Sequence, residues 1–143
     1  MTTQDAVETA LLTYLSGALI GAYPTVQAVY SVESASNCYL KKIPFVLSTL
    51  HDHQVDVNGN RHDWQLLLQI ATSTFPGAQA SLAAVQLADR AMVDAVNAAI
   101  NGAAGYAALR ALGIYTAECK AMAYNQQTPQ MINPHLFTCL TFA

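Results

Sequence analysis

The fold is decided by residues 45–73, which read FVLSTLHDHQVDVNGNRHDWQLLLQIATS. Asn58 and Gly59, near the middle of this stretch, are the residue types that best tolerate the positive φ angles of a two-residue type I′ turn. A turn at this point folds the chain back so that His53 lies opposite Trp64. The stretch therefore predicts a long hairpin of two antiparallel strands.

This pairing sorts the side chains of the hairpin onto two faces, because successive residues of a strand point to opposite sides of a sheet. The face predicted to be apolar carries Phe45, Leu47, Val55, Val57, Trp64, Leu66, Leu68 and Ile70. The face predicted to be polar carries Ser48, Asp52, Gln54, Asp56, Arg61, Asp63, Gln65 and Gln69. A sheet with one apolar and one wet face needs a helical layer over the apolar side.

The segments on either side of the hairpin can supply that layer. Apolar residues at helical spacing predict an N-terminal helix that is capped by Thr2 or Thr3 and ends at Gly21 or at Tyr23-Pro24. The other predicted elements are helices at 78–100 and 105–112, strands at 25–32, 114–124 and 136–142, and loops at 33–42 and 125–134. The predicted fold is α+β, a mostly antiparallel twisted sheet with a long hairpin, packed on one face by two main helices.

The composition points to a subunit of an assembly. Charged residues make up only 10% of the chain, against about 25% in typical soluble domains, and 53% of the residues are hydrophobic. A protein that stays in solution as a monomer usually carries more charge than this. We therefore expect residues 1–143 to form a single domain whose surface is partly covered by copies of itself or by partners.

Charge and cysteine content exclude several classes of function. The net charge is −3 and the six Lys and Arg residues are scattered, which disfavours sequence-specific binding of nucleic acid. The three cysteines form no C-x-x-C motif, which indicates a reducing cytoplasm rather than a disulfide framework or a cysteine zinc site. Residues 10–22 lack the basic flank of a signal peptide and are too short to span a bilayer, so we expect neither secretion nor a membrane location.

The sharpest candidate for chemistry is a group of three histidines. The predicted pairing places His51, His53 and His62 on one face of the hairpin, and three or four converging ligands of this kind can hold a metal ion. The neighbouring carboxylates of Asp52 and Asp63, however, are predicted to point to the other face. We therefore favour histidines that shield the rim of the core or face a neighbouring subunit, and keep a metal site as the alternative.

Other catalytic arrangements are not indicated by the sequence. It has no G-x-S-x-G motif and no glycine-rich loop between a strand and a helix, and the hairpin carboxylates lie on a face where water solvates their charge. We predict no catalytic residue, no cofactor and no resident metal, and hence a protein that is not an enzyme. Trp64 is expected to anchor the core, with a subunit contact as the alternative.

Five features follow one another along almost the whole chain. They are a helix ending near Tyr23-Pro24, a strand that begins after Pro44, a return strand reading RHDWQLLLQI at 61–70, the helix at 78–100 and a closing strand at 136–142. In this layout the chain resembles the tail terminator, or tail completion, proteins of long-tailed bacteriophages. The resemblance is one of pattern and order rather than of a diagnostic motif.

The resemblance implies a structural virion protein that is assembled in the host cytoplasm. Such a subunit forms a homo-oligomeric ring, typically six-fold, which caps the tail tube and gives the neck or connector proteins a docking surface, while DNA passes through the lumen without sequence-specific binding. Contacts with the tube or with neighbouring subunits are expected on the polar hairpin face and tip. The residues expected to make them are Asp52, Gln54, Asp56, Asn58, Arg61 and Asp63.

Three alternatives remain open at this point. Another ring-forming neck or head-tail connector subunit would share the same features. A small metal-binding enzyme would use His51, His53 and His62. A non-viral oligomeric binding module would use Trp64 to line a ligand pocket.

Overall fold

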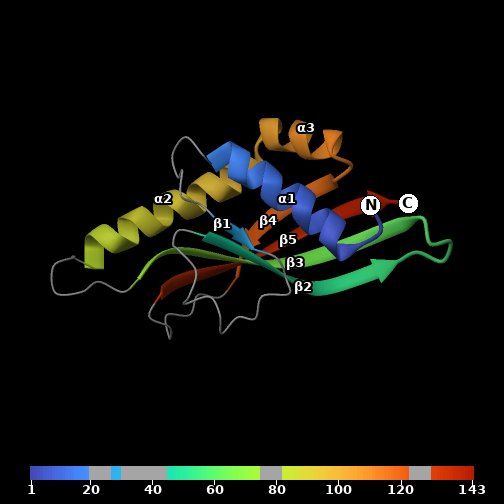
Figure 1. Cartoon of the computed structure of the whole chain (residues 1–143). Coiled ribbons are helices and arrows are strands. Elements are labelled where there is room, and N and C mark those ends of the chain that lie inside the picture. Colours follow the sequence, from blue (N-terminus) through green and yellow to red (C-terminus); the bar gives the residue numbers. More distant parts are fainter. Residues whose placement is uncertain (20–26, 30–44, 75–81, 123–129) are drawn as a thin grey trace.

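The computed structural model describes residues 1–19, 27–29, 45–74, 82–122 and 130–143. Within these ranges, three helices lie on one side of a twisted five-stranded sheet (Figure 1). The elements are α1 (Gln4–Leu19), β1 (Gln27–Val29), β2 (Phe45–Val55), β3 (Arg61–Thr74), α2 (Leu82–Asn101), α3 (Ala103–Ala111), β4 (Tyr115–Ala121) and β5 (Gln130–Phe142). The predicted α+β fold is confirmed.

The strands lie in the order β1-β2-β3-β5-β4. β1 pairs with β2 in parallel, and the other three pairs are antiparallel. The predicted strand at 25–32 is described only at 27–29, and the predicted loop at 33–42 lies outside the described residues. We call the sheet face that packs against the helices the upper face, and the opposite face the lower face.

The N-terminal helix forms where its apolar spacing predicts. Its cap is Thr3, whose side-chain oxygen accepts a hydrogen bond of 3.3 Å from the backbone N–H of Ala6. The stop predicted at 21–24 lies outside the described residues. The buried side chains of α1 face the sheet, and with one exception, Glu8, they are apolar: Val7, Leu11, Leu12, Leu15 and Leu19.

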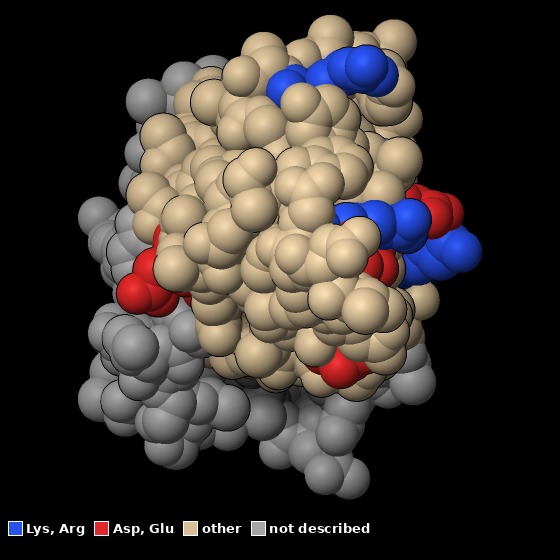
Figure 2. All heavy atoms as spheres, turned by 90° about the vertical axis from the view of Figure 1, so that its right-hand side faces the viewer, with Lys and Arg blue, Asp and Glu red and all other residues tan. Residues whose placement is uncertain are grey.

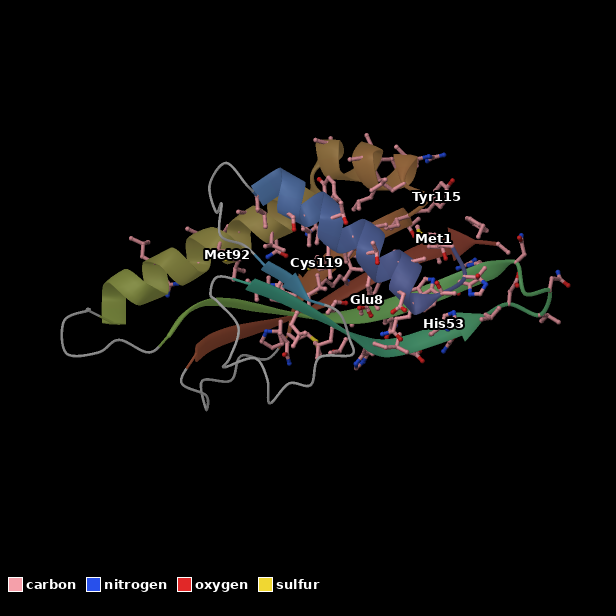
Figure 3. All side chains as sticks on the ribbon, viewed as in Figure 1. Met1, Glu8, His53, Met92, Tyr115 and Cys119 are labelled. Carbon is pink, nitrogen blue, oxygen red and sulfur yellow. The ribbon has the colours of Figure 1, made fainter. Side chains whose placement is uncertain are left out.

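One core joins the helices to the upper face of the sheet. Alternate residues of β3 and β5 point into it, as expected for strands with one buried face. Besides the buried residues of α1, the strands contribute Val46, Trp64, Leu66, Leu68, Ile70, Cys119, Phe137 and Cys139 to this core, and the other helices contribute Met92, Val96, Ile100 and Leu109. Figure 3 shows Met92 and Cys119 between the two layers.

The outer half of the hairpin has the predicted register. His53 lies opposite Trp64, as the sequence predicts. The turn itself differs, because residues 57–60 form a four-residue loop instead of a two-residue type I′ turn. Its closing bonds run from the N–H of Asp56 to the carbonyl of Arg61 and from the N–H of Gly59 to the carbonyl of Asp56, both at 3.0 Å. Within the described part of the chain only Gly59 of this loop has a positive φ, +71°, so a single left-handed residue is enough.

The loop also changes the exposure of two predicted core residues. Val57 lies in the loop and is fully exposed, and Val55, the last residue of β2, is 47% exposed. The prediction that both belong to the apolar face in the core was therefore wrong. The helical layer does not extend over this end of the hairpin, which projects beyond it (Figure 1).

The inner half of the hairpin differs from the prediction by one residue. The pairing shifts between Leu50 and Asp52, so His51 is an extra residue in β2 with no counterpart in β3. An extra residue of this kind is a β-bulge, which disrupts the ladder locally and bends the strand. The sequence pattern of the hairpin gave no sign of it, since the alternation on either side reads equally well without a bulge.

The bulge exchanges the faces predicted for the first half of β2. Val46 lies opposite Ile70 and Ser48 lies opposite Leu68, so both point into the core on the upper face. Leu47 consequently lies on the lower face, where it is also buried. The predicted placement of Leu47 on the core face and of Ser48 on the wet face was wrong.

The last strand begins earlier than predicted. Residues 130–134 belong to β5 and pair with β3, although the predicted loop at 125–134 included them. Pro134 has no N–H group to donate. Its carbonyl accepts a bond of 2.9 Å from the N–H of Met122, just after β4, so it points away from β3. The nitrogen of a strand residue points to the same side as its carbonyl, so the proline nitrogen also faces away from β3. The ladder between β3 and β5 therefore loses no bond to the proline.

Candidate functional site

Most of the predicted contact residues lie together on the lower face of the hairpin. Asp52, Gln54, Arg61 and Asp63 line a shallow hollow of about 300 Å³. Trp64, Gln65 and Thr138 complete its lining. We call this feature the polar hollow. The remaining two predicted residues, Asp56 and Asn58, lie beside it in the turn region at residues 56–60 and are exposed.

The polar side chains of the polar hollow are bonded to one another at the surface. Arg61 bonds the Oδ1 atom of Asp63 at 3.1 Å, and the side-chain amide of Gln54 donates to Asp52 at 3.2 Å. Both partners of the Arg61–Asp63 pair are about half exposed, so the pair contributes little to stability. Exposed and mutually paired groups of this kind suit contact with another polar surface better than acid–base chemistry.

Asp56 has a structural task within the turn region. Its carboxylate accepts hydrogen bonds from the backbone N–H groups of Asn60 at 2.8 Å and Arg61 at 3.1 Å. The bond from Arg61, followed by the one from Asn60, lowers the pKa of Asp56 below its usual value. The turn region is thus held in one shape, and its exposed side chains are presented on a defined frame.

The predicted histidine group is only partly assembled. His53 and His62 meet on the upper face, with 2.9 Å between the Nε2 atom of His53 and the Nδ1 atom of His62. His51 is the bulge residue and is exposed. In the part of the chain that the structure describes, no group of three histidine, cysteine or acidic side chains is placed to hold a metal ion.

Trp64 is the anchor of the hairpin end of the core, as predicted. It is 2% exposed, and its indole N–H donates to the Oγ1 atom of Thr141 at 2.9 Å. The hydroxyl of Thr141 in turn donates to the carbonyl of Met1 at 2.5 Å, and the amino group of Met1 donates to the carbonyl of Phe142 at 2.8 Å. Figure 3 shows Met1 and His53 at this same end of the molecule. A chain of hydrogen bonds therefore ties β3, β5 and the N-terminal residues together.

Sequence reasoning missed a group of aromatic side chains near the edge strand β4. The guanidinium of Arg110 lies 5.9 Å from the ring centre of Tyr106 and 5.5 Å from that of Tyr115, and it donates to the Tyr106 hydroxyl at 2.8 Å. Tyr115 contacts Phe142 edge to face at 5.5 Å. We call these four residues the aromatic patch. Tyr106 and Arg110 are four residues apart in a helix, a spacing visible in the sequence, but their approach to Tyr115 and Phe142 depends on the tertiary fold.

The aromatic patch adds to the apolar surface at the hairpin end. Tyr106 is 50% exposed and Phe142 is 42% exposed. Figure 2 looks onto this end and shows a broad uncharged area, with the charged side chains mostly toward its margins. Aromatic residues and arginine are the types enriched at protein interfaces, so this end has the composition of a contact surface.

Two cysteines in the described part of the chain lie in the core. Cys119 and Cys139 are free and buried, and desolvation raises the pKa of each thiol to about 12. Cys38 lies outside the described residues. Among the helices described, none has the length and apolar character needed to cross a membrane.

No protein-family model matches the sequence, and no curated protein matches it.

Proposed function

We propose that this chain is a structural subunit of a bacteriophage tail, a tail terminator that forms a ring on the head-proximal end of the tail tube and joins it to the neck. The observation that carries the proposal is the projecting hairpin. It ends in a firmly bonded turn region that exposes the whole side chain of Val57 to solvent. Covering such an exposed aliphatic side chain with a partner is energetically favourable, because the contact removes apolar surface from water.

The proposal joins this observation to the resemblance in layout and to the low charge content of 10%. A ring closes through a heterologous contact, in which one surface of a subunit meets a different surface of the next. The turn region, the polar hollow and the aromatic patch supply one such surface. Its polar and charged groups would set the register of the contact, while the apolar side chains would supply most of the stability.

Passage of DNA through such a ring requires that the lumen not bind it tightly. The net charge of −3 and the scattered basic residues fit that requirement, because a mildly acidic surface repels phosphate. The tail tube protein on one side and neck or connector proteins on the other are the expected partners.

The first test is the oligomeric state of the purified protein. We expect annular particles in negative-stain electron microscopy and one discrete high-mass species in sedimentation velocity. A Val57→Glu variant should sediment as a smaller species, because it places a charge in the buried contact. The matched control is Leu87→Glu on α2, another exposed aliphatic residue, at 69% exposure, and it should keep the ring.

The proposed ring would be refuted by a wild-type protein that stays monomeric at tens of micromolar concentration. The assignment of the hairpin to the contact would be refuted by rings that survive Val57→Glu. A tail terminator is then distinguished from another neck subunit by cosedimentation with purified tail tubes that lack their cap, since a terminator must bind them.

A further inference from the structure

His53 and His62 face one another through their ring nitrogens. The Nε2 atom of His53 and the Nδ1 atom of His62 are 2.9 Å apart, the ring centroids are 5.2 Å apart and the ring planes differ by 13°. The centroid distance exceeds the nitrogen distance by about the radii of two imidazole rings. The two nitrogens therefore point straight at each other in nearly coplanar rings, which is the geometry of one N–H···N hydrogen bond.

This geometry holds a proton between the rings rather than a metal ion. Two imidazoles that bind one metal aim their lone pairs at a third point, at about 2.0–2.1 Å from each nitrogen. Here the two lone-pair directions coincide, so only one of them can be an acceptor while the other carries the hydrogen. The pair can therefore be neutral or carry one charge and keep its bond, but a second charge leaves two donors facing each other.

The surroundings make that second charge costly. His62 is 7% exposed, and His53 stacks on the indole of Trp64 with 3.6 Å between ring centroids and 4° between planes. Desolvation lowers the pKa of His53, His62 lowers it further, and the carboxylate of Asp52 opposes both. Other titratable groups at this end of the molecule are Asp56 in the turn region, Cys139, which pairs with Trp64 in the sheet, and the amino group of Met1, while the carboxyl of Glu8 is buried on the sheet-facing side of α1.

We propose that His53 and His62 form an acid-sensitive latch for the outer half of the hairpin. At neutral pH their shared proton ties β2 to β3 above Trp64. Below the pH at which the second proton binds, the two cations repel each other, His53 leaves the indole, and the outer hairpin loosens. The inference concerns one subunit and does not depend on the proposed function.

The direction of the pH effect follows from proton linkage. The pKa of His53 is lower in the folded protein than the ordinary value of about 6.5, so the unfolded chain binds more protons between the two values. Stability then falls as the pH decreases from about 6.5 to the folded pKa, and it changes no further below it. The latch is closed above this window and open below it.

The experiment uses Trp64, the only tryptophan of the chain, as a reporter. Emission of the wild-type protein is recorded between pH 8 and pH 4.5, with far-UV circular dichroism to confirm that the fold persists. We expect a transition with its midpoint below about 6.5, in which the emission maximum moves to longer wavelength as the ring is uncovered. His53→Gln should abolish the transition, because an amide does not titrate there.

The control is His51→Gln, which removes a nearby exposed imidazole and should leave the transition unchanged. A flat wild-type profile, or a transition that survives His53→Gln, would overturn the latch. If His53→Gln fails to fold, His62→Gln replaces it with the same expected loss. A change in neutral-pH emission on adding a chelator would also overturn it, because the pair would then hold a metal.

Discussion

Replacing Gly105 by alanine tests the close approach of α2 and α3. A Cβ atom at Gly105, in the first turn of α3, would lie 1.9 Å from the carbonyl oxygen of Ala99 and 2.9 Å from that of Ile100, both near the end of α2. To restore ordinary contact, one helix must move by roughly 1.5 Å against a packed core. The obstacle is backbone, so no change of side-chain rotamer can relieve it.

The expected size follows from two opposing effects. Overpacking of this kind costs up to about 3 kcal/mol, while alanine gains up to about 1 kcal/mol over glycine in a helix. The net loss is about 2 kcal/mol, which lowers the melting temperature of a domain of this size by roughly 6 °C. The matched control is Gly17→Ala in α1, where nothing lies within 4 Å of the new methyl group. It should raise stability by about 0.5 kcal/mol.

The assay is urea unfolding followed by Trp64 fluorescence and circular dichroism, with all variants at one protein concentration. The same substitution at the two glycines should move the midpoint in opposite directions. If Gly105→Ala is as stable as Gly17→Ala, the close approach of α2 and α3 is not a feature of the folded protein.

Two further outcomes are expected. Asn101→Ala should destabilise the protein by about 2 kcal/mol in the same urea assay. The Asn101 side chain donates to the Cys119 carbonyl at 3.0 Å and accepts from the Cys119 N–H at 2.9 Å, and these two bonds join α2 to β4. An unchanged midpoint would contradict this prediction. Cys119 and Cys139 should react with Ellman's reagent at pH 8 only after unfolding, since burial raises both thiol pKa values to about 12 and keeps the thiols protonated. Rapid labelling of the peptides that contain these cysteines in the native protein, seen by mass spectrometry, would count against this prediction.

The sequence was a good guide wherever a face is set by local alternation. The pairing of His53 with Trp64 and the buried face of β3 were predicted because large apolar residues occupy every second position from Trp64 to Ile70. The main helices were predicted because their apolar spacing agrees with the helical period. These elements agree with both the local pattern and the final packing.

The structure differs from the sequence-based prediction where one extra residue in a strand, or a contact with a residue distant in sequence, determines the local structure. Nothing local distinguishes a bulge at His51 from regular pairing, and Pro134 became part of a strand only because its nitrogen faces away from β3. The candidate site divides in the same way. The polar face that lines the polar hollow was predicted from alternation in the hairpin, whereas the aromatic patch and the direct contact of His53 with His62 depend on how elements and side chains meet.

The bulge gives the hairpin a tolerance to changes in chain length. Because His51 is surplus to the ladder, its removal would leave Leu50 opposite Leu66 and Val46 opposite Ile70, as they are now. Removal of a residue from the outer half, such as Gln54, with the bulge kept, would instead turn every preceding side chain of the strand over. Homologous chains that differ in length by one residue at position 51 should therefore keep the same interior, and alignments of this region should place their gap there.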